Sequence, residues 1–277
     1  MILDTHLHLV YPDRFTYPAA GADPELRQPG HLETYLAEAR PLGITRMIHM
    51  EVCVADRDVE AETAFVTGLS APAIAGAVSS CRPEDDGFPA FLDRAAANPA
   101  IVGFRRVLHT EPVELPRSPR FRENLRRLGT RYSFDICALA RQLPDAADLA
   151  AACPDVQFVL DHCGIPDVRS DSLDPWRTDI RQLAALDNVM CKISGVIAYR
   201  DPARGTVDDL RPYVEHCIAS FGWHRVVWGS DWPICTRTAD LTRWVEATHT
   251  LLAGCSADEK DALLQRNAER IYLNRHH

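Results

Sequence analysis

The sequence predicts an α/β protein, a (β/α)8 TIM barrel with an extra C-terminal helix. Short apolar or β-branched runs alternate eight times with amphipathic helical patterns, as in a closed barrel of parallel strands. The length of 277 residues and the apolar fraction of 46% suit one large barrel. A doubly wound open sheet is the alternative, but the first run is not followed by a glycine-rich phosphate turn. No linker is visible, so residues 1–277 are expected to form a single domain.

Eight segments have the length and apolar content of strands that are buried on both faces, as parallel barrel strands are. They are Ile2–Leu7, Arg46–Glu51, Ile74–Ser79, Ile101–Arg106, Ser133–Cys137, Gln157–His162, Val189–Ser194 and Val226–Gly229.

The helices expected between these strands have apolar side chains at helical spacing. They are Leu32–Leu42, Val59–Leu69, Phe88–Ala97, Phe121–Leu128, Asp145–Ala152, Trp176–Leu186, Val207–Ser220 and Leu241–Leu252. The extra helix is expected at Ala257–Tyr272, where Ser256 and Glu259 have the spacing of a capping box.

The composition excludes several classes of protein. A formal net charge of −9 argues against a general nucleic-acid binder. Charges interrupt every apolar run before it reaches the roughly 18 residues that would span a membrane. The N-terminus has no basic segment followed by a long apolar one, so a cytoplasmic location is expected. The nine cysteines are scattered and contain no CxxC pair, which favours reduced core residues over a disulfide framework.

Titratable residues follow three of the expected strands. His6 and His8 are two residues apart on the first strand and therefore project to one face. At the mouth of a barrel such a pair suits one divalent metal, although two hydrogen-bonded histidines at a strand end would look the same. Asp231 follows the last strand, where it can accept a proton from water, ligate a metal or form an Asx-turn.

The sixth strand ends in Asp161 and His162, which strand alternation would direct to opposite faces. We expect His162 to face the barrel centre, because imidazole suits both metal ligation and proton transfer. A histidine bonded to backbone at the barrel rim is the alternative.

Together these residues resemble the amidohydrolase superfamily, and more narrowly the amidohydrolase-2 branch that contains sugar lactonases and pyrone-dicarboxylate lactonase. The resemblance covers nearly the whole chain. Its motifs are DTHLH at 4–8, GFRR at 103–106, LDHCG at 160–164, CKISG at 191–195, FGWHRVVWGSDWP at 221–233 and NAERIY at 267–272. The GSDWP and KxSG segments are the most discriminating.

The resemblance implies a barrel hydrolase that opens lactones of sugar acids or related carboxylated rings. It implies that Asp231 is the general base and that His6 and His8 belong to the metal or substrate cradle. Members of this branch use one zinc or manganese ion, or none, so metal-free action stays open. Members with two metals usually carry a bridging carbamylated lysine, and Lys192 on the seventh strand is misplaced for that role, which argues against a binuclear site.

Further residues are candidates for the site. Glu51 ends an apolar strand and is a candidate metal ligand, and its spacing from His49 predicts that both face inward. One of Arg105 and Arg106 should point inward to hold a substrate carboxylate or hydroxyl, and the resemblance favours Arg105.

Three other side chains are candidate substrate contacts. Lys192 is expected to bind a substrate oxygen or to pair with Asp231, and His109 is a candidate loop contact. Tyr17, like Tyr11, lies in the loop Val10–Gly30 and could cover a sugar ring.

The chemistry of these residues fits lactone hydrolysis, which needs an activated water, an electrophile on the carbonyl and a proton donor. The expected partner is a small anionic or polyhydroxylated lactone, without nucleic acid or membrane. A metal-dependent decarboxylase is the alternative enzyme, and a barrel that only binds a ligand is the third hypothesis. The sequence leaves the oligomeric state open, including a homo-oligomer, and the loops Val10–Gly30 and Ala198–Thr206 are expected to select the substrate.

Overall fold

The computed structural model describes residues 1–18, 24–69, 71–168, 172–200 and 206–274, and confirms the predicted barrel. Its eight parallel strands are hydrogen-bonded in sequence order, so each strand lies beside the next one along the chain. They are β1 Ile2–Leu7, β2 Ile44–Met50, β3 Ile74–Ser80, β4 Ile101–Val107, β5 Ser133–Cys137, β6 Gln157–Leu160, β7 Val189–Ile193 and β8 Val226–Trp228.

The sheet closes between β8 and β1 through contacts just beyond the last strand. The backbone N–H of Asp231 donates to the carbonyl of His6 at 2.7 Å, and that of His8 donates to Trp232 at 2.7 Å. The buried Asp4 carboxylate accepts the N–H of Ser230 at 2.8 Å. The closure therefore fixes the first-strand histidines beside Asp231.

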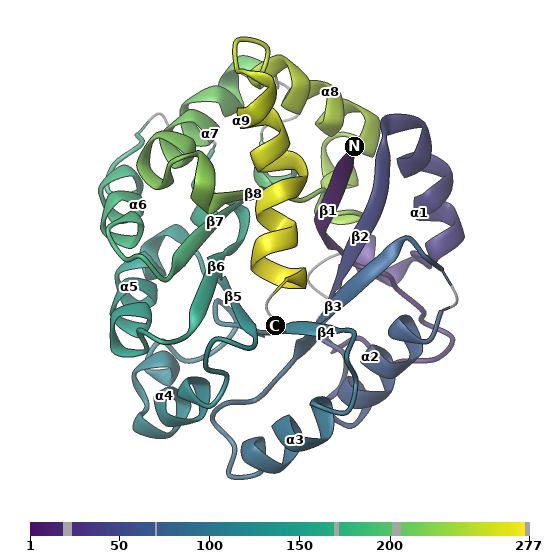
Figure 1. Cartoon of the computed structure of the whole chain (residues 1–277), viewed down its shortest axis with the longest axis vertical. Coiled ribbons are helices and arrows are strands. Elements are labelled where there is room, and N and C mark those ends of the chain that lie inside the picture. Colours follow the sequence, from purple (N-terminus) through teal and green to yellow (C-terminus); the bar gives the residue numbers. More distant parts are fainter. Residues whose placement is uncertain (19–23, 70, 169–171, 201–205, 275–277) are drawn as a thin grey trace.

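Helices surround the strands, as Figure 1 shows. They are α1 Leu32–Ala39, α2 Val59–Thr67, α3 Phe88–Ala95, α4 Pro119–Arg126, α5 Leu143–Ala152, α6 Trp176–Ala184, α7 Val207–Phe221 and α8 Leu241–Leu251. The first helix ends earlier than predicted because Arg40–Leu42 tightens into a 3₁₀ turn before Gly43, whose φ is +79°.

The extra C-terminal helix is confirmed and covers the amino-terminal end of the barrel, where it runs across the centre of Figure 1 in yellow. It begins as α9 Ala257–Asp261 and continues through two π-helical segments, Ala262–Arg266 and Glu269–Leu273. The predicted capping box is present, since the N–H of Ser256 donates to Glu259 at 2.7 Å. Ile271 and Tyr272 pack against the apolar side chains that fill the amino-terminal half of the barrel, here called the lower barrel. These side chains are Leu3, Ile48, Met50, Val78, Val102, Val159, Met190 and Val227.

The register of β1 shifts relative to β2 between Asp4 and Leu7. Leu3 belongs to the lower barrel core, yet His6, three positions later, contacts groups at the other end of the barrel interior. An irregularity in the strand allows this, because strict alternation would place positions 3 and 6 on opposite faces.

The cysteine prediction is also confirmed. All nine cysteines are free thiols, and seven of them are buried. Among the described residues, no helix combines the length and apolar character needed to cross a membrane.

Candidate active site

A cavity of about 760 Å³ opens among the loops that follow the carboxyl ends of the strands. His8, Glu51, Arg105, His162 and Asp231 all line it. They come from the ends of five different strands, as the active-site residues of barrel enzymes do.

His6, His8 and Asp231 form the centre of the site. Asp231 Oδ1 lies 3.6 Å from Nε2 of His6 and 3.6 Å from Nε2 of His8. All three side chains are buried. Asp231 takes a left-handed backbone conformation, with φ of 59°, directly beyond the small residues Gly229 and Ser230.

The environment of His6 and His8 favours the neutral imidazole form that can bind a metal. Nδ1 of His8 lies 3.0 Å from the carbonyl oxygens of both Met50 and Glu51, so this nitrogen carries the proton and Nε2 presents its lone pair to the site. Burial lowers the pKa of His6 well below its ordinary value, although Asp161 opposes this shift. The His6 ring is therefore neutral near pH 7, the form that ligates metals.

His162 lies in the site as predicted, but the prediction that Asp161 points away from it is wrong. His162 Nδ1 lies 2.9 Å from Ser194 Oγ and 3.9 Å from Asp231 Oδ2. Asp161 Oδ1 lies 3.4 Å from Nδ1 of His6. Strand alternation fails because β6 ends at Leu160 and His162 has a positive φ of 55°, which turns both side chains inward.

Two glycines in the discriminating motifs allow these close approaches. A Cβ at Gly195 would lie 2.4 Å from Nδ1 of His162, and a Cβ at Gly229 would lie 2.7 Å from Cβ of His6. Neither distance is physically allowed, so the KxSG and GSDWP glycines make room for the imidazoles of His162 and His6.

Lys192 faces inward but does not pair with Asp231, so that expectation is wrong. Its Nζ donates to Asp135 Oδ2 at 2.5 Å and lies 2.9 Å from Asp161 Oδ1 and 3.2 Å from His6 Nδ1. Burial opposes its charge, but the two carboxylates raise the pKa of Lys192 above its ordinary value. Lys192 therefore stays protonated beneath the site, fully buried, and its substrate contact remains only a prediction.

The same lysine separates the pKa values of its two carboxylate partners. Burial raises the pKa of Asp135 to about 6, against the opposing effect of Lys192. Burial would also raise that of Asp161, but Lys192 and His6 hold it well below its ordinary value. Asp161 therefore remains ionised beside His6.

Arg105 points inward, as predicted, and its partner is Glu51. Its Nε donates to Glu51 Oε1 at 2.6 Å, while the N–H of Cys53 donates to Glu51 Oε2 at 2.7 Å. Both carboxylate oxygens of Glu51 are thus engaged, and a metal-ligand role for Glu51 stays a prediction that this geometry does not favour. The expected inward orientation of His49 is wrong, since its Nε2 lies 3.4 Å from Glu62 in the helix layer.

The cavity rim holds the remaining predicted residues. Arg106 lines the cavity too, although only one of the two adjacent arginines is expected to point inward, and its guanidinium lies 2.8 Å from Glu84 and 3.0 Å from Glu111. His109 lines the cavity as expected.

Tyr17 packs within the first loop, where its hydroxyl accepts the N–H of Tyr11 at 2.9 Å. A role for it over a sugar ring remains a prediction. Residues 19–23 and 201–205 of the two expected substrate-selecting loops lie outside the described residues.

The site meets the requirements for one divalent metal. The ligand atoms of His6, His8 and Asp231 lie within 4.8 Å of one another, and a second such group contains His6, Asp161 and His162. Asp231 Oδ2 is buried and accepts no hydrogen bond from the described residues. Two imidazoles and a carboxylate are a common donor set for a catalytic metal that keeps an open coordination position.

A barrel whose strand ends gather histidines and an aspartate in this way has the architecture of a metal-assisted hydrolase or lyase. The amidohydrolase family model matches residues 3–273, and the chain belongs to this family. The chain is 31% identical to L-fucono-1,5-lactonase of Burkholderia multivorans over 98% of this chain and 95% of the relative.

Solved structures agree with this assignment. An amidohydrolase of Burkholderia multivorans with bound zinc superimposes with a TM-score of 0.87 at 27% identity, covering 98% of this chain and 99% of that one. 5-Carboxyvanillate decarboxylase of Sphingomonas paucimobilis is more distant, with a TM-score of 0.66 and 15% identity over 98% of both chains, and shares the fold alone.

Proposed function

We propose that this protein is a lactonase that opens the ring of a sugar-acid lactone with water activated by Asp231. The observation that supports this most strongly is the buried Asp231 carboxylate, which has one oxygen beside two imidazoles and the other free of hydrogen bonds from the described residues. The similarity to L-fucono-1,5-lactonase along nearly the full chain supports the choice of substrate class.

The protein supplies the proton transfers that the reaction requires. Asp231 takes the proton of the attacking water, and the ring oxygen needs a proton as it leaves the carbonyl carbon. His162, 3.9 Å from Asp231 Oδ2 and held by Ser194, is the proposed proton carrier. Burial lowers the pKa of His162, so its ring is neutral and ready to accept a proton near pH 7.

One zinc or manganese ion would be held by His6, His8 and Asp231. Such an ion acts as a Lewis acid that polarises the lactone carbonyl and acidifies water. Below these ligands, the ionised Asp161 and the protonated Lys192 fix the orientation of the His6 ring.

The charges around the cavity favour a polyhydroxylated lactone over a multiply charged one. Each cavity arginine is already paired with a carboxylate. The shortest contacts are 2.6 Å for Arg82–Asp56, 2.6 Å for Arg105–Glu51, 2.8 Å for Arg106–Glu84 and 3.1 Å for Arg237–Glu25. Paired arginines still donate hydrogen bonds to hydroxyl groups, but they offer little uncompensated positive charge.

A lactone screen combined with metal analysis tests the proposal. The purified protein, loaded with zinc or manganese, is offered aldonolactones, including L-fucono-1,5-lactone, and aldarolactones, and ring opening is followed by proton release. We expect turnover of at least one aldonolactone, a loss of turnover on chelation, and less bound metal in His6→Ala and His8→Ala variants. The proposal fails if the metal-loaded protein opens none of these lactones, or if it instead releases carbon dioxide from an aromatic acid.

A further inference from the structure

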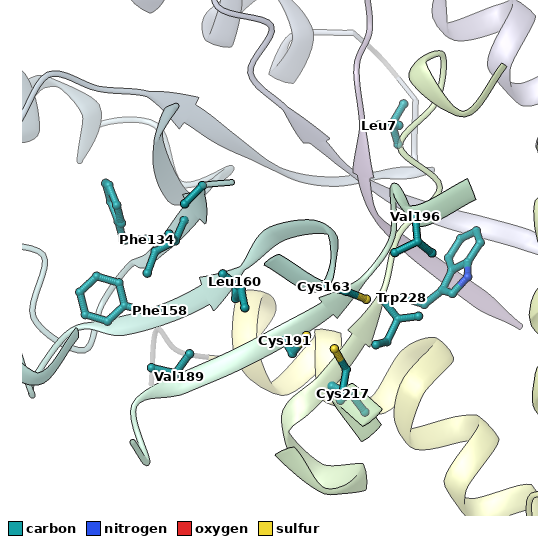
Figure 2. Packing of buried hydrophobic residues seen from close by; sticks show 14 of the residues in the cluster. Leu7, Phe134, Phe158, Leu160, Cys163, Val189, Cys191, Val196, Cys217 and Trp228 are labelled. Carbon is teal, nitrogen blue, oxygen red and sulfur yellow. The ribbon is translucent and has the colours of Figure 1, made fainter. Parts of the chain in front are cut away.

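Three cysteines that are far apart in the sequence meet inside the protein, outside the active site. They are Cys163 in the turn after β6, Cys191 on β7 and Cys217 on α7. Their sulfur atoms all lie within 4.8 Å of one another, and Figure 2 shows the three side chains converging. None of the three has any exposed surface.

The three cysteines of this three-thiol cluster belong to the main apolar core. Leu160, Val189 and Val196 belong to the same buried core, as Figure 2 shows. Within the described parts of the chain, no histidine or carboxylate joins the three sulfurs as a fourth ligand. A structural zinc site normally has four protein ligands, so the cluster does not match one.

The spacing of the sulfurs fits a three-coordinate ion. An ion about 2.3 Å from each of three sulfurs, the length of a zinc–thiolate bond, places those sulfurs about 4 Å apart if it lies in their plane, and closer together if it is pyramidal, as arsenic(III) is. This value lies within the 4.8 Å limit of the cluster. Soft thiolates prefer thiophilic ions over oxygen-seeking ones.

We propose that Cys163, Cys191 and Cys217 form a binding site for a three-coordinate thiophilic ion of the arsenic(III) class. A buried complex that carries a net charge would need compensating charge, whereas a neutral one would not. Arsenic(III) with three thiolates is neutral overall. In the reaction, arsenous acid and three thiols give one arsenic tris-thiolate and three waters. Three As–O bonds and three S–H bonds break, three As–S bonds and three O–H bonds of water form, and no atom changes oxidation state.

Binding at this site would affect the proposed lactonase. Cys163 directly follows His162, and both residues have a φ of 55°. Cys191 directly precedes Lys192, which holds Asp135 and Asp161. Movement of these thiols toward a common ion would shift both backbones, so occupancy should reduce turnover. Because the thiols are fully buried, loading requires local opening of the structure and should be slow.

Native mass spectrometry after long incubation with arsenite tests the proposal. The wild-type protein should gain one arsenic atom and lose three protons, the signature of a tris-thiolate. Cys217→Ala should lose this adduct, and any two-thiol adduct that forms in it should retain a hydroxyl group. Cys191→Ala, on a different element, repeats the test. Cys153→Ala is the matched control, because Cys153 is equally buried but lies outside the cluster.

The outcomes distinguish this site from the lactonase centre. Arsenite should reduce turnover in wild type and in Cys153→Ala, a dithiol should restore it, and Cys217→Ala should resist. A tris-thiolate adduct that persists in both cluster variants would overturn the proposal, as would its absence from wild type. Either result leaves the lactonase proposal intact, since the mass measurement does not depend on turnover.

Discussion

Asp231 is the residue whose replacement should cost the most activity. Asp231→Asn keeps the size of the side chain but removes the proposed base, so kcat should fall about 100-fold or more. The main-chain bond from Asp231 to His6 is retained, and the far-UV circular dichroism spectrum should not change. Asp240→Asn is the control, because Asp240 caps α8 and asparagine caps equally well. Undiminished turnover in Asp231→Asn would contradict the assigned role.

Gly195 offers a second test, with a control that isolates one physical effect. Gly195→Ala and Gly43→Ala both place a side chain at positive φ, +66° and +79°, which costs about 1–2 kcal/mol of stability. At Gly43 the new Cβ has no neighbour within 4 Å, whereas at Gly195 it collides with His162. We expect both variants to lose stability in urea unfolding, but only Gly195→Ala to lose much of its turnover. Equal turnover in the Gly195→Ala and Gly43→Ala variants would show that turnover does not depend on the position of His162.

The direction of a side chain could be derived from strand alternation only where its backbone has regular strand geometry. His6, His8 and Asp231 were identified because they stand at strand ends in recognisable spacing. Asp161 was assigned to the wrong face because alternation cannot anticipate the left-handed conformation of His162.

Asp135 was not identified as part of the site. A charged residue within a short, fully buried strand is a sequence signal that could have revealed it.

Among the elements, the C-terminal helix should stabilise the barrel in part through a buried hydrogen bond of Tyr272. Tyr272 donates its hydroxyl to Asp135 Oδ2 at 2.8 Å, beside Lys192. Tyr272→Phe removes this donor from a buried carboxylate and should lower the free energy of unfolding by about 1.5–3 kcal/mol. Chemical denaturation measures this, and a double-mutant cycle with Asp135→Asn should show coupling between the two sites. Simple additivity would mean that this bond contributes little.

The elements were easier to predict than their ends. Each of the eight strands is a distinct buried run between helical patterns, and this alternation determined the barrel. The strand ends were misplaced where local geometry departs from the average, as at β6, which stops at Leu160, and β2, which stops at Met50. Because the site is built at these ends, site geometry was less predictable than the fold.

At the scale of the whole molecule, the net charge of −9 says little about the site. The cavity contains arginines that are each paired with a carboxylate. The balance of positive and negative charge around it therefore differs from the negative net charge of the whole chain. Only the fold joins these pairs, because their members are distant in sequence.

The contribution of His162 to the stability of the protein should decrease as the pH falls below the ordinary pKa of histidine. Burial lowers the pKa of His162, so just below pH 6.5, the ordinary histidine value, the unfolded chain binds a proton that the folded protein does not. The contribution of His162 to the free energy of unfolding should therefore decrease as pH falls through this window and level off above it. His162→Asn should remove up to about 1.4 kcal/mol per pH unit from the slope, and asparagine tolerates positive φ. Urea unfolding between pH 5 and 8, with metal removed by a chelator, measures how the free energy of unfolding changes with pH. His249→Asn, on the exposed side of α8, is the control. If His162→Asn and His249→Asn change the slope equally, burial of His162 is not the cause.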